Sequence, residues 1–152
     1  MTTASSVERF LAHETVALVG ASRSGKRFGN TLLKDLSAKG WDVAVVHPGA
    51  DEIDGHRCYS TLAQLPEEVE ALVVCVPPDE TERVVREAAA HGITDIWMQL
   101  GSASPEAVRF CAEHGLNAVH DECVLMFARP TGVHRFHRWL WGVFGRLPVR
   151  DA

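Results

Sequence analysis

Short apolar runs alternate along this chain with segments of helical character, and this alternation restricts the folds that are open to it. Five runs of five to seven residues are apolar enough to be strands buried on both faces. They cover residues 15–20, 41–46, 71–76, 94–100 and 116–120. Strands separated by helices pair in parallel, and right-handed crossovers then place helices on both faces of the sheet. The sequence therefore predicts an α/β fold, a Rossmann-like, doubly wound, five-stranded parallel sheet.

The segment after the first run predicts a helix. Phe28, Leu32, Leu33 and Leu36 recur at the spacing of one helical face, which should be buried against the sheet. Gly40 ends this helix, because glycine adopts the left-handed conformation that terminates helices.

Two more helices carry recognisable start signals. Asp79 with Glu82 three residues later is typical of a helix start in which the aspartate caps the first turn. Ser104 before Pro105 predicts another start, with proline at the first helical position. The connection between the second and third runs is less regular, and we expect it to hold a short helix over residues 59–65.

Length and composition fit a single domain. The 152 residues are 46% hydrophobic and 23% charged, which is enough to bury a core. We expect the domain to cover residues 1–131 and a tail to cover residues 132–152. The net charge of −5 argues against nucleic acid as a partner. The first residues lack the features of a secretory signal, and no run of ~18 apolar residues predicts a transmembrane segment.

The cysteines indicate a reducing compartment. Cys58, Cys75, Cys111 and Cys123 are widely spaced, and none forms a C-x-x-C pair. The spacing therefore favours neither a zinc site nor a thioredoxin-like dithiol. Reduced thiols are typical of cytoplasmic proteins, and we expect a cytoplasmic location.

The tail differs in charge from the domain. Residues 134–152 hold four arginines and one aspartate, which gives this segment a net charge of +3. Because the whole chain has a net charge of −5, the other residues together carry −8. Aromatic and aliphatic residues in this segment form a helical stripe. Three uses fit this pattern: packing on its own domain, contact with a second copy or another protein in a dimer or complex, and binding to a membrane surface.

The stretch GASRSGKR, residues 20–27, comes close to the phosphate-binding signature G-x-x-x-x-G-K-[ST]. Its last position is Arg27, where nucleotide-hydrolysing enzymes need a hydroxyl to bind magnesium. Those enzymes also need an acidic residue at a second strand end, but the run over 71–76 ends in Val76 followed by Pro77. The sequence therefore argues against nucleotide hydrolysis.

A dinucleotide oxidoreductase is a second possibility. Its loop should read G-x-G-x-x-G, whereas the glycines here are Gly20, Gly25 and Gly29. An acidic residue should close the second strand to bind a ribose diol, but this run is followed by His47. An NADP-type ligand fits better than NAD, because its extra phosphate could meet Arg23 and Lys26. This alternative stays open.

A loop that binds phosphate is the third possibility. In doubly wound sheets ligands bind outside the carboxyl ends of the strands, where the strand order reverses. Residues 20–27 follow the first strand and lead into a helix N-terminus, whose free N–H groups attract phosphate. Arg23, Lys26 and Arg27 add three positive charges to an otherwise acidic chain.

Five short motifs, each at a strand end, carry a resemblance. In chain order they are VALVGAS, VVHP, VCVPP, IWMQLG and VHDEC. With them, residues 15–129 resemble the small, standalone CoA-binding proteins related to the CoA-binding domain of the succinyl-CoA synthetase α subunit. The resemblance implies binding of coenzyme A or acyl-CoA by a single Rossmann-like domain without catalysis of its own, which could serve regulation.

The resemblance also implies which residues bind the cofactor, coenzyme A. The first loop should lie beside the phosphates, with two further basic residues as partners on charge alone. The turns after the second and third strands should flank the adenine and ribose, and the end of the fourth strand should face the pantetheine. These expected positions are Gly20, Ala21, Ser22, Arg23, Ser24, Lys26 and Arg27 for the phosphates, His47, Pro48, Val76 and Pro77 for the nucleoside, and Gln99 for the pantetheine.

Two departures from the family bear on these expectations. Relatives often carry a basic residue where this chain has Gly49, and often read Asp-Arg-Cys where this chain has Asp121, Glu122 and Cys123. We expect Glu122 to point away from an anionic ligand. Cys123 leaves a third alternative open, a thiol-dependent acyl or redox reaction, although the position fits a small apolar residue in a packed turn better.

Overall fold

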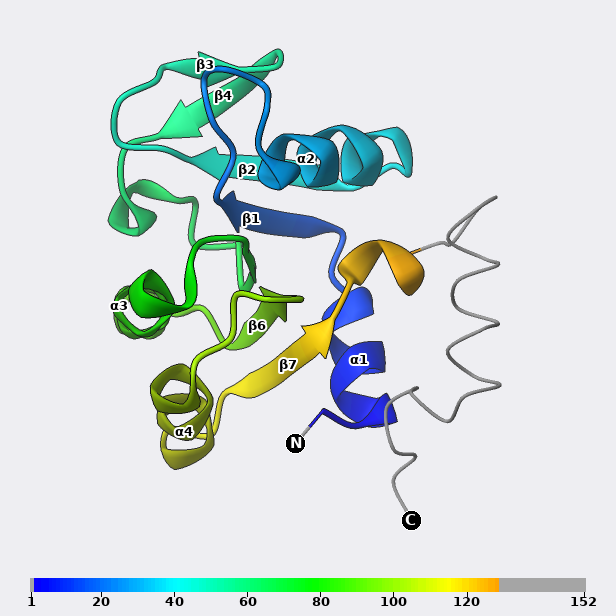
Figure 1. Ribbon diagram of the computed structural model, residues 1–152, viewed down its shortest axis with the longest axis vertical. Coiled ribbons are helices and arrows are strands. Elements are labelled where there is room, and N and C mark those ends of the chain that lie inside the picture. The colour runs from blue at the N-terminus through cyan, green and yellow to red at the C-terminus, as the bar shows by residue number, and fades with distance from the viewer. Residues whose placement is uncertain (1, 129–152) are drawn as a thin grey trace.

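A seven-stranded sheet forms the centre of the computed structural model, which describes residues 2–128, and helices cover both faces of the sheet (Figure 1). The strands are β1 (Thr15–Val19), β2 (Asp42–Val46), β3 (Glu52–Ile53), β4 (His56–Tyr59), β5 (Ala71–Val74), β6 (Asp95–Gln99) and β7 (Asn117–Glu122). Their order is β3-β4-β2-β1-β5-β6-β7, and all neighbours are parallel except β3 and β4. The predicted α/β fold with parallel strands is confirmed.

The strand count differs from the expected five. The two extra strands, β3 and β4, form a short hairpin that extends the sheet beyond β2. This hairpin occupies the start of the segment for which a helix over 59–65 was expected, and only a single 3-10 turn, η1 (Leu62–Gln64), forms there. The hairpin is short, polar and at the edge of the sheet, so it lacks the apolar pattern that identifies buried strands.

The helices form two layers. Helices α1 (Ala4–Leu11) and α2 (Phe28–Ala38), with the 3-10 turn η2 (Val124–Met126), pack on one face of the sheet. Helices α3 (Pro78–Ala90) and α4 (Pro105–Glu113) pack on the other face (Figure 1). Trp97 is fully buried in the first layer, and its Nε1 donates a hydrogen bond to the backbone carbonyl of Glu122.

The two predicted start signals have different outcomes. Ser104 caps α4 as expected, because its hydroxyl accepts a hydrogen bond from the backbone N–H of Ala107. The prediction that Asp79 caps α3 is wrong. The helix begins at Pro78, two residues earlier than a cap at Asp79 requires, with Pro77 at the N-cap position and no side-chain cap. Proline is already suited to the first helical position, so Asp79 falls within the first turn.

Helix α1 was not predicted from the sequence, and a buried carboxylate fastens it to the sheet. Asp95, at the start of β6, is 1% exposed. Its oxygens lie 2.9 Å from Arg9 Nε and 3.3 Å from His13 Nε2, and they accept hydrogen bonds from Thr94 and Asn117. One side chain thus joins α1, the segment after it and two strands.

Replacing Asp95 with alanine should lower the free energy of unfolding by about 2 kcal/mol, because the buried donors around it lose their acceptor. Arg9→Ala should cost less than about 1 kcal/mol, because the Arg9 side chain is 57% exposed. Urea denaturation of both variants measures the difference. Equal effects would show that Asp95 acts only as the surface partner of Arg9.

The expected tail, residues 132–152, lies outside the described residues. Within residues 2–128 no helix is both long and apolar enough to cross a membrane. All four cysteines are free thiols, and no cluster of three metal-binding side chains occurs in this part of the chain.

Candidate ligand site

The strand order reverses at β1, and the loop over residues 20–27 begins there. Strand β2 pairs with one side of β1 and β5 with the other. Helix α2, which follows β1, and helix α3, which follows β5, pack on opposite faces of the sheet. The crevice between two such connections is where doubly wound proteins bind ligands.

Two glycines set the position of this loop. Gly20 has φ +125°, and a Cβ added to it would lie 2.1 Å from the carbonyl oxygen of Cys75. A Cβ on Gly29, in the first turn of α2, would lie 2.3 Å from the carbonyl oxygen of Gly20. The loop is therefore packed between the end of β5 and the start of α2, and no larger side chain fits either contact. Gly20 was an expected site residue, whereas the role of Gly29 was not recognised.

The N-terminus of α2 has no side-chain cap, although Gly29 and Asn30 in its first turn are buried and the N–H of Asn30 donates to the carbonyl oxygen of Arg27. Arg27 occupies the N-cap position and makes no side-chain hydrogen bond to the first turn. The first N–H groups of a helix have no partner within it, and the helix dipole adds positive potential there. Arg23, Lys26 and Arg27 are all exposed around this end. The arrangement has the donors and the charge that a phosphate group requires.

Not every expected residue in the loop presents its side chain. Ala21 is 5% exposed and belongs to the core, so only its backbone can face a ligand. The backbone N–H of Ser22 already donates to Asn30 Oδ1 at 2.9 Å. Ser24 is exposed, and its hydroxyl lies 2.9 Å from the hydroxyl of Ser22.

The turns expected to flank a nucleoside lie on the two strands next to β1. Pro48 follows β2 and is exposed, and Pro77 follows β5 and is exposed. His47 is half-buried, and its Nδ1 accepts a hydrogen bond from the backbone N–H of Gly49 at 3.0 Å, which leaves Nε2 for other partners. Val76 is likewise half-buried. The two turns thus lie on either side of the loop that begins at the end of β1.

Arg23 reaches one of these turns. Its Nη1 donates to the carbonyl oxygen of Gly49 at 3.3 Å. Gly49 is the position at which the resemblance led us to expect a basic residue. The guanidinium of Arg23 therefore supplies positive charge close to the position that lacks its own basic side chain.

The end of β6 differs from expectation. Gln99 was expected to face the pantetheine, but it is 1% exposed, and its Oε1 accepts a hydrogen bond from the N–H of Val124. Its side chain holds η2 against the sheet. Leu100, the next residue, is 57% exposed, and Phe28 at the start of α2 is 48% exposed, although the helical spacing placed Phe28 in the buried stripe. Both apolar side chains lie at the carboxyl edge of the sheet.

The thiol and carboxyl groups at this edge resist ionisation. Burial, with a smaller effect of Cys123, raises the pKa of Cys75 to about 11. Burial, followed by the charge of Asp121, raises the pKa of Glu122 to about 7, and Glu122 Oε2 has no hydrogen-bond partner. Cys75 is therefore protonated at neutral pH and is a poor nucleophile. Glu122 is 8% exposed, in keeping with the expectation that it avoids the ligand.

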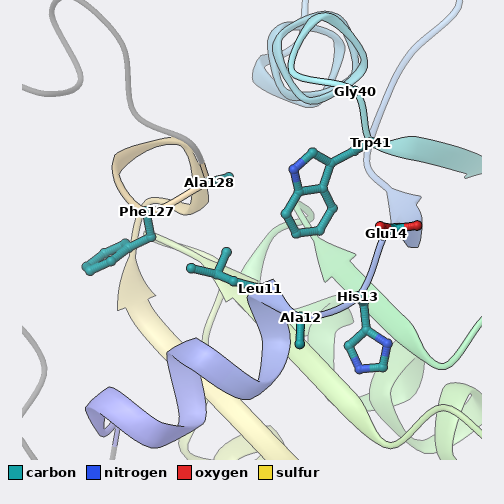
Figure 2. A pocket seen from close by; sticks show the side chains of 8 residues that line it. All are labelled: Leu11, Ala12, His13, Glu14, Gly40, Trp41, Phe127 and Ala128. Atoms are coloured by element: carbon teal, nitrogen blue, oxygen red, sulfur yellow. The ribbon is translucent and has the colours of Figure 1, made fainter.

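The pocket in Figure 2 contains none of the expected residues. It has a volume of about 370 Å³, and its walls include Leu11, Trp41 and Phe127. Glu14 and Trp41 directly precede β1 and β2, so this pocket lies toward the amino ends of those strands. A second groove, of about 600 Å³ between α2 and the β3–β4 turn, includes Gly25 from the loop.

Comparison with known proteins places the chain in a family. A family model for a CoA binding domain matches residues 14–129. The chain belongs to this CoA-binding domain family. The matched segment contains β1, the loop, α2 and every strand that follows, so the family relationship covers the whole candidate site.

The relatives of this CoA-binding domain include large ligases and small proteins. The ADP-forming acetate–CoA ligase I of Archaeoglobus fulgidus is 26% identical over 130 residues, which is 79% of this chain and 19% of the ligase. A conserved hypothetical protein from Pyrococcus furiosus is 38% identical with a TM-score of 0.71, over 74% of this chain and 97% of that protein. A hypothetical protein from Pyrococcus horikoshii is 29% identical with a TM-score of 0.74, over 91% of this chain and 92% of that protein. The chain spans about a fifth of the length of the ligases it matches.

Proposed function

We propose that this domain binds coenzyme A or a CoA thioester at the loop over residues 20–27 and catalyses no reaction of its own. The observation that carries the proposal is the N-terminus of α2, which has no side-chain cap and directly follows that loop at the reversal of strand order. Phosphate groups bind at such helix ends because free N–H groups and the helix dipole both favour an anion. The family relationship names the ligand class that this edge would accept.

The chemistry of the surrounding residues fits the parts of this ligand. Arg23, Lys26 and Arg27 complement the pyrophosphate and the 3′-phosphate of coenzyme A. In this proposal the adenine ring lies between the turns that carry the exposed Pro48 and Pro77. Phe28 is exposed at the same edge of the sheet and offers further apolar surface to the ligand.

The pantetheine arm extends, in this proposal, toward the end of β6. Leu100 is the apolar group exposed there, whereas Gln99 is buried beneath it. The proposal includes no covalent step: burial keeps the Cys75 thiol protonated, and Arg27 stands where a hydrolase needs a hydroxyl. The thiol of the alternative reaction, Cys123, is a half-buried free cysteine at the start of η2, and a Cys123→Ser variant that kept all measurable activity would reject that alternative.

Calorimetry and thermal unfolding with coenzyme A, dephospho-CoA, NADP and ATP test the proposal. Coenzyme A at 100 times its dissociation constant should raise the free energy of unfolding by about 2.7 kcal/mol. A double Arg23→Gln, Lys26→Gln variant should bind at least about 10-fold more weakly, because two charge-assisted contacts to phosphate are lost. Arg109→Gln, at an exposed position of α4 on the other face of the sheet from α2, removes a cation outside the loop and should bind normally.

The ligand series separates the alternatives. Tighter binding of NADP than of coenzyme A would favour the dinucleotide reading over the one proposed here. Equal affinity for coenzyme A and dephospho-CoA would show that the basic residues do not read the 3′-phosphate. Absence of binding by all four compounds would reject the proposed function.

A further inference from the structure

Asn30 is a buried polar residue behind the phosphate loop, and the function proposed above gives it no role. It is the third residue of α2 and is 5% exposed. Its Oδ1 accepts hydrogen bonds from the backbone N–H and the hydroxyl of Ser22, at 2.9 and 3.2 Å. Its Nδ2 donates to the carbonyl oxygen of Ser22 at 2.9 Å and to Asp54 Oδ2 at 3.0 Å.

These four bonds use the whole capacity of the amide. An asparagine side chain has two acceptor sites on its oxygen and two donors on its nitrogen, and each of the four has a partner here. Asn30 therefore has nothing left to offer a ligand without breaking a bond within the protein. Three of the four bonds end on Ser22, so the side chain fixes both the direction of the backbone and the hydroxyl of one loop residue.

The order imposed on Ser22 extends along the loop. Because the Ser22 hydroxyl donates to Asn30, it can only accept from the Ser24 hydroxyl, which lies 2.9 Å away. The backbone N–H of Lys26 donates in turn to the Ser24 hydroxyl, at 3.4 Å. One buried amide thus sets the direction of a hydrogen-bond chain that runs through three loop residues.

The fourth bond links the loop to the hairpin at the edge of the sheet. Asp54 lies in the turn between β3 and β4, with φ +49°, a conformation that aspartate, asparagine and glycine tolerate best. Asp54 is exposed, whereas Asn30 is buried. The hairpin therefore reaches the phosphate loop through Asn30.

We propose that Asn30 is the positioning residue of the phosphate loop, and that Asp54 holds Asn30 in the orientation that shapes this loop for a phosphate-bearing ligand. The inference rests on the proposed function for the identity of that ligand, but the ordering of the loop does not depend on it. The hairpin that extends the sheet is then part of the binding apparatus, because its turn determines how the loop presents its donors and cations.

The first test uses the protein without ligand. Hydrogen exchange followed by NMR should show the Ser22 amide protected in the native protein. In Asn30→Ala this amide should exchange at least about 10-fold faster, because its acceptor is gone, while amides within β1 keep their rates. Unchanged protection of Ser22 would overturn the proposal whatever the ligand is.

The second test uses binding of coenzyme A. Asn30→Ala should weaken binding about 30-fold and Asn30→Asp more, because the carboxylate cannot donate and faces Asp54 and the phosphates. Asn30→Ala should lower the affinity for adenosine 3′,5′-bisphosphate, which lacks pantetheine, by the same factor. Native affinity in Asn30→Ala would overturn the proposal, whereas failure of the native protein to bind would reject only the proposed function and leave the exchange test to decide.

A matched pair at position 54 separates positioning from loss of fold. Asp54→Asn keeps an acceptor for Asn30 and tolerates positive φ, so affinity should stay within about 2-fold of the native value. Asp54→Gly relieves the backbone but removes the acceptor, and affinity should fall about 5-fold with little change in the melting temperature of the free protein. Equal affinity of these two variants would overturn the role given to Asp54.

Discussion

Replacing Gly29 with alanine should displace the phosphate loop and destabilise the whole domain. The new Cβ would lie 2.3 Å from the carbonyl oxygen and 2.5 Å from the carbonyl carbon of Gly20, and both are backbone atoms. Either α2 or the loop must move, which should lower the free energy of unfolding by about 3 kcal/mol. Affinity for coenzyme A should fall at least about 100-fold, because the loop and the helix N-terminus separate. Urea denaturation and calorimetry measure the two effects.

Gly25→Ala is the control within the same loop. Gly25 has φ +72°, but nothing lies within 4 Å of a Cβ added there. The substitution should therefore cost only the backbone strain, about 1 kcal/mol, and leave α2 in place. If both substitutions had the same effect, the loss at Gly29 would come from glycine's flexibility and not from the close approach of helix and loop.

Glycine spacing alone did not reveal this contact. The sequence showed Gly20, Gly25 and Gly29 as a failed dinucleotide fingerprint, because the expected spacing is G-x-G-x-x-G. The structure shows that Gly20 and Gly29 nevertheless make the close contacts that bring a strand end, a loop and a helix together. The longer loop between them holds the three cations.

The central strands could be predicted because burial on both faces leaves a continuous apolar run. Strands β1, β5 and β6 have no exposed residue, and each was recognised. Strands β3 and β4 are two and four residues long and lie at the edge, so most of their side chains need not be apolar. Strand β3 pairs only with β4, across the turn at Asp54 and Gly55, and β4 joins the sheet through two residue pairs with β2. The Asp-Gly pair in that turn is a local hairpin signal that was not used.

The sequence predicted where the candidate site lies in the fold better than it predicted which side chains are exposed there. Strand ends could be located, and a parallel sheet brings them to one edge. Which side chains point outward there depends on packing that a single sequence does not reveal. The polar Gln99 is buried and accepts a hydrogen bond from Val124, whereas the apolar Phe28 is exposed. Both are the opposite of what their positions in the sequence predicted.

Asn30 was overlooked for the same reason. Its role consists of hydrogen bonds to Ser22, eight residues earlier, and to Asp54, twenty-four residues later. No periodicity or motif connects three such positions. An asparagine in the first turn of a helix behind a glycine-containing loop is the only local signal, and it fits helix capping equally well.

Glu122 should make the free energy of unfolding depend on pH. Its carboxyl is buried at the end of β7, and one oxygen has no hydrogen-bond partner. Burial and then the neighbouring charge of Asp121 raise the pKa of Glu122 from 4.5 to about 7. Asp121 itself lies 2.6 Å from His120 Nδ1, so two further ionisable side chains lie next to Glu122 in the sequence. The folded protein holds a proton on Glu122 that the unfolded chain releases.

The direction of the pH effect follows from that proton. Between pH 4.5 and about 7 the folded state binds more protons than the unfolded state, so the contribution of Glu122 to stability falls as the pH rises. Above about pH 7 the carboxylate is charged in both states, and the loss reaches about 3 kcal/mol. Glu122→Gln should remove this loss, since the amide stays neutral at every pH.

The variant should match the native protein at pH 4 and exceed its free energy of unfolding by about 3 kcal/mol at pH 8. Subtracting the two pH profiles removes the contributions of groups that do not interact with position 122, so the difference belongs to Glu122 and its interaction with Asp121. Glu113→Gln, on the exposed side of α4, should give a flat difference. A flat difference for Glu122→Gln as well would mean that water or a rearranged side chain solvates the carboxylate, and that the orphaned oxygen of Glu122 is not a source of instability in this fold.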